Sequence, residues 1–213
     1  MPKSSPCQCQ KVIDLFNDLF TASYNTQLVC AVCDGRQGEL DQPVYEPANR
    51  QRAHHQIVFA HGHFASALHE ISHWCVAGDA RRLLEDFGYW YQPDGRSKQQ
   101  QKEFEKVEIK PQALEWLFSL ASRQVFVASA DNLTAGTADD LAFRLAVSSQ
   151  ARSFFSHGLP PQAALWLAQL KQTYGGQVLF EHLYWPDEEV KFERPTITWA
   201  YRVKESSLEK KTA

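Results

Sequence analysis

The segment HGHFASALHEISHW, which runs from His61 to Trp74, contains four of the eight histidines of the chain and spells His-Glu-x-x-His at positions 69 to 73. Two histidines four residues apart on a helix lie about 40° apart around its axis, so both imidazoles can bind one ion. His69 and His73 are therefore predicted to be metal ligands, with Glu70 beside them.

The opposite side of this predicted helix is apolar and would anchor it against the core. The residues on that side are Phe64, Leu68, Ile71 and Cys75. The alternative is that the histidines and Glu70 form only the solvent-exposed face of an amphipathic helix. Small and apolar residues flank the histidines, which is unusual for such a face and favours the metal site. These flanking residues are Ala65, Ser72, Val76 and Ala77.

Two imidazoles do not hold a divalent metal well, so a carboxylate from another element is expected as the third ligand. The candidates downstream are Glu85, Asp86, Glu103, Glu105, Glu108 and Glu115. Glu108 stands between Val107 and Ile109, and an acid between β-branched apolar neighbours is expected to point inward. Glu103 and Glu105 belong to a polar, lysine- and glutamine-rich stretch. We therefore expect Glu108 to complete the site.

The spacing of these residues leaves the chemistry open. In a zinc metallopeptidase, Glu70 would be the general base and the downstream carboxylate the third zinc ligand. Two histidines and one carboxylate also form the facial triad of non-haem Fe(II) oxygenases. A third option is a non-catalytic binding module with a closed, structural metal site. No His-x-Asp or His-x-Glu occurs in the chain, which argues against a jelly-roll oxygenase.

Hydrophobic periodicity predicts an α+β fold, a single helix-rich domain with a few short strands. The missing His-x-Asp and His-x-Glu motifs indicate that it is not a jelly roll. Helices are expected at 12–20, over the histidine segment after His63, at 79–87, 97–104, from Pro111 to 121, and at about 139–155 and 161–174. A strand is expected at 57–60, a loop with room for a short strand at 31–53, and strand-like alternation at 197–203. The domain is predicted to span 1–203, followed by a flexible tail at 204–213.

Composition narrows the function classes. The 213 residues are 44% hydrophobic, enough for a sizeable core. The net charge of −3 gives no basic footprint, so no direct nucleic-acid partner is expected. The N-terminus lacks the apolar region of a signal peptide, and no stretch is apolar enough to span a membrane, so a cytoplasmic protein without a membrane partner is predicted. Five cysteines, an odd number, do not suggest a disulfide framework.

Three strings resemble the elongation factor P hydroxylase family: IVFAHGHFASALHEISHWCVAG, RRLLEDFGYWYQPDGR and FEKVEIKPQALEWLF. The resemblance is close from about Arg52 to Phe118 and looser elsewhere. One departure is Cys30-Ala-Val-Cys33, in an N-terminal loop that looks longer here. A single Cys-x-x-Cys lacks the second pair that a structural zinc site needs, so we interpret it as a feature of this lineage.

The resemblance implies a metal-dependent monooxygenase that uses molecular oxygen to hydroxylate the β-lysylated lysine of elongation factor P, as the last step of that modification. It implies His69, His73 and Glu108 as ligands of a divalent metal, Fe(II) in a hydroxylase and zinc in the alternative. It implies Glu70 only as a site residue, where it would orient a ligand or meet the substrate amine rather than act as a hydrolytic base.

Overall fold

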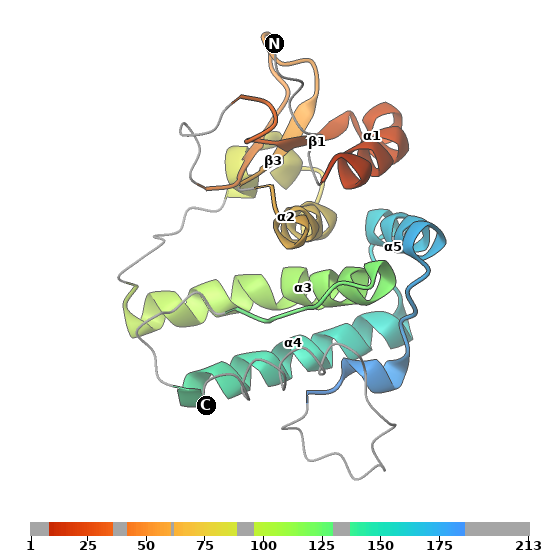
Figure 1. Cartoon of the computed structure of the whole chain (residues 1–213). Coiled ribbons are helices and arrows are strands. Elements are labelled where there is room, and N and C mark those ends of the chain that lie inside the picture. The colour runs from red at the N-terminus through yellow and green to blue at the C-terminus, as the bar shows by residue number, and fades with distance from the viewer. Residues whose placement is uncertain (1–8, 36–41, 61, 89–95, 130–136, 186–213) are drawn as a thin grey trace, which may run out of the picture.

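A computed structural model describes residues 9–35, 42–60, 62–88, 96–129 and 137–185. The fold is α+β and helix-rich, as predicted, with the sheet and α1 at one end and α3 and α4 side by side at the other (Figure 1). The helices are α1 (Gln10–Tyr24), α2 (Phe64–Val76), α3 (Lys98–Ser122), α4 (Thr137–His157) and α5 (Pro161–Tyr174), and the strands are β1 (Thr26–Cys30), β2 (Val44–Glu46) and β3 (His55–Phe59). Short 3-10 helices occupy Arg81–Leu83, Glu85–Gly88 and Phe180–Leu183.

The sheet has the strand order β1-β3-β2, with β1 parallel and β2 antiparallel to the central β3. This arrangement is not a jelly roll, and β2 is the short strand expected within 31–53. The strand β1 was not predicted, although TQLVC alternates buried and half-buried positions. Asn17 of α1 fixes β1 from the side, because its amide accepts from the Leu28 N–H at 2.7 Å and donates to the Leu28 carbonyl at 3.3 Å.

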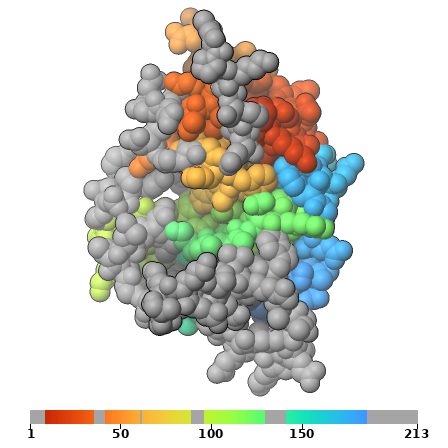
Figure 2. Space-filling model, viewed as in Figure 1, coloured from red at the N-terminus to blue at the C-terminus, as the bar shows by residue number. Residues whose placement is uncertain are grey.

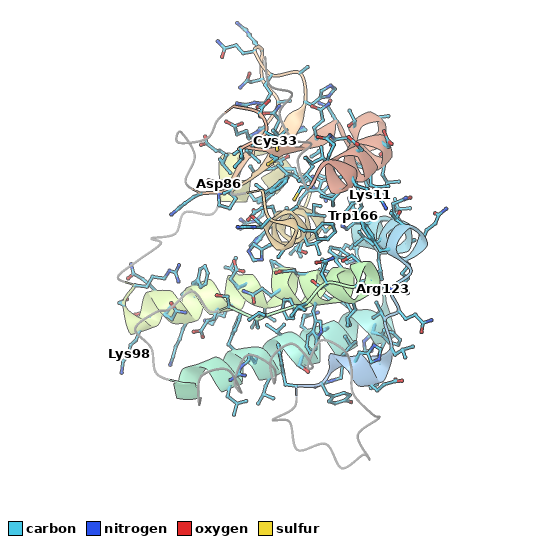
Figure 3. The ribbon with its side chains drawn as sticks, viewed as in Figure 1. Lys11, Cys33, Asp86, Lys98, Arg123 and Trp166 are labelled. Carbon is cyan, nitrogen blue, oxygen red and sulfur yellow. The ribbon has the colours of Figure 1, made fainter. Side chains whose placement is uncertain are left out.

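An aromatic cluster joins α1, α2 and α5. The Phe16 ring lies 5.3 Å from Trp74 and 5.7 Å from Trp166, and Phe20 lies 4.9 Å from Trp74. All four side chains are fully buried, and Figure 3 shows Trp166 projecting from α5 toward α1 and α2. Edge-to-face contacts of this kind add to the free energy gained by burial. The cluster therefore holds α2 firmly by the side that faces away from its histidines.

The helix α3 corrects a prediction, since the sequence suggested one helix at 97–104 and a second that begins at Pro111. A single helix runs through both, and Figure 3 shows Lys98 and Arg123 at its two ends. It begins with a capping box between Ser97 and Gln100. An interior proline removes one backbone hydrogen bond. Burial offsets this loss, because every residue from 111 to 122 is buried between α2, α4 and α5.

The predicted helix at 79–87 is also wrong. Two 3-10 helices replace it, because Asp86 and Phe87 adopt left-handed φ values of 46° and 56°. Contacts with β2 explain this local conformation: the Asp86 carboxylate accepts from the Tyr45 N–H at 2.8 Å, and the Phe87 ring stacks on Tyr45 at 4.1 Å. Tertiary contacts override the helical periodicity of the segment.

The helices predicted at about 139–155 and 161–174 are confirmed as α4 and α5. No helix in the described ranges is long and apolar enough to cross a membrane. Among the described cysteines, Cys9, Cys30 and Cys75 are buried and Cys33 is exposed. The strand-like stretch at 197–203 and the predicted tail at 204–213 lie outside the described residues, so these predictions and the 1–203 boundary stand as predictions.

Candidate metal centre

The two motif histidines share one side of α2. The Nε2 atoms of His69 and His73 lie 3.1 Å apart, and their side chains are 30% and 15% exposed. The opposite side is apolar as predicted, with Leu68, Ile71 and Cys75 buried. The space-filling view shows α2 and α3 meeting in the middle of one face, beside α5 (Figure 2). The helix is thus anchored on one side and presents both imidazoles on the other.

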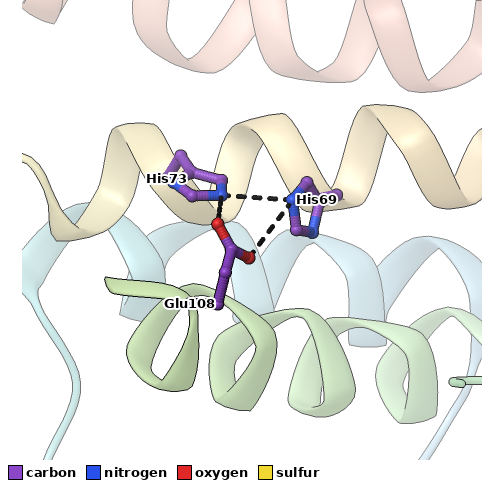
Figure 4. Close-up of side chains that lie close together, drawn as sticks. All are labelled: His69, His73 and Glu108. Carbon is purple, nitrogen blue, oxygen red and sulfur yellow. Dashed lines mark hydrogen bonds and ion pairs between the residues drawn. The ribbon is translucent and has the colours of Figure 1, made fainter. Parts of the chain in front are cut away.

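Glu108 reaches the same point from α3. Its Oε1 lies 3.2 Å from His73 Nε2, and its Oε2 lies 3.6 Å from His69 Nε2 (Figure 4). The structure therefore brings together the three residues that the sequence singled out, from helices that are consecutive along the chain. Within the described residues, no other group of three or more histidine, cysteine or carboxylate ligand atoms could hold a metal ion.

The spacing of the two imidazole nitrogens and the two oxygens of Glu108 suits a first-row divalent metal. Nitrogen and oxygen ligands sit about 2.0–2.2 Å from such an ion, so adjacent ligands at tetrahedral or octahedral angles are separated by roughly 2.8–3.6 Å. The separations of 3.1 and 3.2 Å lie within this range, and 3.6 Å is at its edge. Two imidazoles and one carboxylate on one side would leave further coordination positions open.

A second carboxylate of α3 orients His69. Glu115 is buried, and its Oε2 lies 2.8 Å from His69 Nδ1. A neutral His69 that donates its Nδ1–H to Glu115 presents the lone pair of Nε2 toward His73 and Glu108. Burial alone would lower the pKa of His69, but the Glu115 carboxylate, together with Glu108 and Glu70, raises it well above its ordinary value.

Glu108 is ionised in this environment although only 5% of it is exposed. Burial opposes ionisation, but the charges and hydrogen bonds of His73, the charge of His69 and a hydrogen bond from Gln112 together lower its pKa to about 2. Gln112 Nε2 donates to Glu108 Oε2 at 3.2 Å. Sequence reasoning missed Gln112; the signal was its position four residues after Glu108, on the same side of a helix.

Glu70 is half-buried beside His69 on α2. Burial raises its pKa above the ordinary value, against the lowering effect of both histidines. Among the described residues, no hydrogen bond or ion pair to its carboxylate was found. The Glu70 carboxylate, which lies next to His69, can therefore take up a proton or bind a cationic ligand.

The remaining candidate carboxylates do not join the ligand group of His69, His73 and Glu108. Glu103 pairs with Lys106 at the surface, Glu105 accepts from Gln101, and Asp86 is used by the Tyr45 N–H. Glu115, also a candidate ligand, contacts the far nitrogen of His69. His61 lies outside the described residues, and His63 is the N-cap of α2.

Comparisons with known proteins agree with the strings quoted above. A family model described as elongation factor P hydroxylase matches residues 15–184, which contain the whole candidate site. The elongation factor P lysine hydroxylase of Haemophilus influenzae is 49% identical over 154 residues, which cover 72% of this chain and 82% of that protein.

Proposed function

Because this chain belongs to the elongation factor P hydroxylase family, we propose that it is a metal-dependent monooxygenase that hydroxylates the β-lysylated lysine of elongation factor P. Hydroxylation would be the last step of that modification, and it would take place in the cytoplasm. Molecular oxygen is the co-substrate: one of its atoms converts a C–H bond of the lysine to C–OH, and the other leaves as water with two electrons and two protons from a donor. The similarity to the elongation factor P lysine hydroxylase of Haemophilus influenzae supports a lysine of elongation factor P as the substrate.

The observation that carries the proposal is the convergence of two imidazoles and one ionised carboxylate within the matched region. His69, His73 and Glu108 would hold the metal, and the facial arrangement is typical of non-haem Fe(II) oxygenases. When bound, Fe(II) supplies the activation of oxygen. Glu115 keeps the Nε2 lone pair of His69 directed into the site, and burial of Glu108 limits the access of water to the carboxylate.

Glu70 is the site residue to which we assign the substrate amine. A β-lysylated lysine carries ammonium groups on a long aliphatic arm, and a half-buried carboxylate beside the ligands can accept a hydrogen bond from one of them. Glu70→Gln removes the charge and keeps the shape. We expect it to raise the KM for the modified protein roughly tenfold or more, an effect of about 1.4 kcal/mol, with little change in metal affinity.

The test is to load the purified protein with Fe(II) under anaerobic conditions and add β-lysylated elongation factor P, oxygen and a reductant. Intact-mass measurement should show the gain of one oxygen atom, and ¹⁸O₂ should place the label in the product. Glu108→Ala is the inactive control, and Glu103→Gln on the exposed side of α3 is the matched control that should retain activity. No mass gain with a substrate verified as modified would overturn the proposal.

The alternative hypothesis, a zinc metallopeptidase, predicts a different activity. A zinc-loaded protein would hydrolyse peptide bonds, and Glu70→Gln would abolish that hydrolysis because the general base is lost. Hydroxylation that persists in Glu70→Gln, at raised substrate concentration, would contradict the peptidase reading.

A further inference from the structure

The side chain of Gln112 is a bridge between the candidate ligand Glu108 and the polypeptide backbone at Ser129. Its Nε2 donates to Glu108 Oε2 at 3.2 Å and to the Ser129 carbonyl at 2.6 Å, and its Oε1 accepts from the Ser129 N–H at 3.0 Å. Only 3% of Gln112 is exposed. The contact between Gln112 and Glu108 is therefore buried, while the two contacts with the exposed Ser129 are partly buried.

The backbone of Ser129 decides which way the Gln112 amide faces. A backbone N–H must meet the amide oxygen, and a backbone carbonyl must meet the amide nitrogen, so the orientation with Nε2 toward Glu108 satisfies both groups. The reverse orientation would place oxygen against two acceptors. The direction of the hydrogen bond to Glu108 is thus fixed by the chain segment at 129.

That segment is itself held against α3. After Arg123 it returns along the helix (Figure 1), and the ring of Phe126 stacks on Trp116 at a centroid distance of 5.5 Å. Trp116 in turn packs on Trp185 at 4.7 Å. Phe126 thus holds the segment that leads to Ser129 against α3, and the backbone of Ser129 contacts the amide from there.

We propose that Gln112 is a positioning residue, which uses Ser129 as its anchor to hold the Glu108 carboxylate toward the two histidines. One carboxylate oxygen is taken by the amide while the other faces His73 at 3.2 Å. Without the amide, only the contacts with the two histidines restrain the carboxylate, and metal binding has to order it further. This inference rests on the proposed role of His69, His73 and Glu108 as ligands.

The chain offers a matched control on the same helix. Gln101 is 7% exposed, and its Nε2 donates to the Glu105 carboxylate at 3.1 Å, also four residues away. Glu105 does not belong to the ligand cluster. Gln101→Met and Gln112→Met therefore each remove a buried amide that donates to a carboxylate four residues away, and only Gln112 contacts a member of the ligand cluster.

The experiment titrates each full-length variant with Co(II) and follows the visible ligand-field absorption, alongside thermal unfolding without metal. We expect Gln112→Met to bind Co(II) about 10- to 100-fold more weakly than the wild type, with altered bands, and Gln101→Met to bind within about twofold. A purely structural Gln112 would lower the thermal stability and leave the Kd unchanged.

An unchanged Kd and spectrum in Gln112→Met would overturn the inference. Should this variant fail to fold, Gln112→Asn keeps an amide on an arm one methylene shorter, which cannot span both partners, and the same loss of affinity is expected. Absence of Co(II) binding by the wild-type protein would overturn the proposed metal centre itself, and the inference with it.

Discussion

Replacing Glu115 by glutamine should weaken metal binding and change the number of protons that binding releases. The side chain keeps its size, but it loses the negative charge that lies 2.8 Å from His69 Nδ1. The amide can also donate to Nδ1, which would favour the tautomer with the proton on Nε2 and block the ligand atom. Removal of such a partner typically lowers metal affinity 10- to 100-fold, which is about 1.4–2.7 kcal/mol.

The proton count follows from the pKa of His69. Because this pKa is raised well above 6.5, His69 holds a proton at neutral pH in the metal-free protein. A metal ligand must be the neutral imidazole, so binding releases about one proton, and affinity falls roughly tenfold per pH unit below that pKa. Without the Glu115 charge, the lowering effect of burial on the pKa of His69 is less strongly opposed, so metal binding at pH 7 should release fewer protons.

Isothermal titration of the anaerobic protein with Fe(II), in two buffers of the same pH and different ionisation enthalpy, measures both quantities. Glu103→Gln, which removes an exposed carboxylate of the same helix, should match the wild type. If Glu115→Gln releases as many protons as the wild type and binds as tightly, the argument that Glu115 controls His69 is refuted.

The remaining predictions concern stability. The pKa of Glu108 is lowered from 4.5 to about 2 in the folded metal-free protein. Its contribution to the free energy of unfolding, roughly 3 kcal/mol at most, is therefore present above pH 4.5 and is lost as the pH falls toward 2. Glu108→Gln should flatten the acid-unfolding curve over that interval. Gly176→Ala should lower the free energy of unfolding, measured by urea titration, by about 1–3 kcal/mol or more, because the added Cβ would collide with two carbonyl oxygens of α3. Gly78→Ala is the control and should be nearly neutral, because the methyl group added there meets open space. Ser97→Ala should lower the free energy of unfolding by about 1 kcal/mol, also measured by urea titration, because the capping box of α3 is lost. An unfolding midpoint unchanged from the wild type would contradict the role of Ser97 as the N-cap.

The sequence predicted the residues of the candidate site better than it predicted the elements that carry them. The helical positions of His69 and His73 follow from spacing alone, and the apolar stripe opposite them is buried as expected. Glu108 was chosen because of its apolar neighbours. The structure gives a different reason for its inward direction: Val107 and Ile109 are only half-buried, and Glu108 shares one side of α3 with Gln112 and Glu115.

Two features could not be read from local sequence because contacts far along the chain decide them. Pro111 signals a helix start by itself, and only the burial of the surrounding turns allows the helix to continue through it. The left-handed backbone at Asp86 and Phe87 depends on Tyr45, which is 41 residues from Asp86 in the chain. The role of Gln112 was equally hidden, because its anchor at Ser129 lies in an irregular segment.

The burial of α3 from residue 111 to residue 122 has a consequence for the dynamics of the backbone that bears Glu115. A helix surrounded on every side has no room to roll or fray, so the backbone that bears Glu115 should be among the slowest in the molecule to exchange its amide hydrogens. Fluctuations of surface loops that do not contact α3 would leave Glu115 in place. Its contact with His69 would then be lost only when the whole domain unfolds cooperatively.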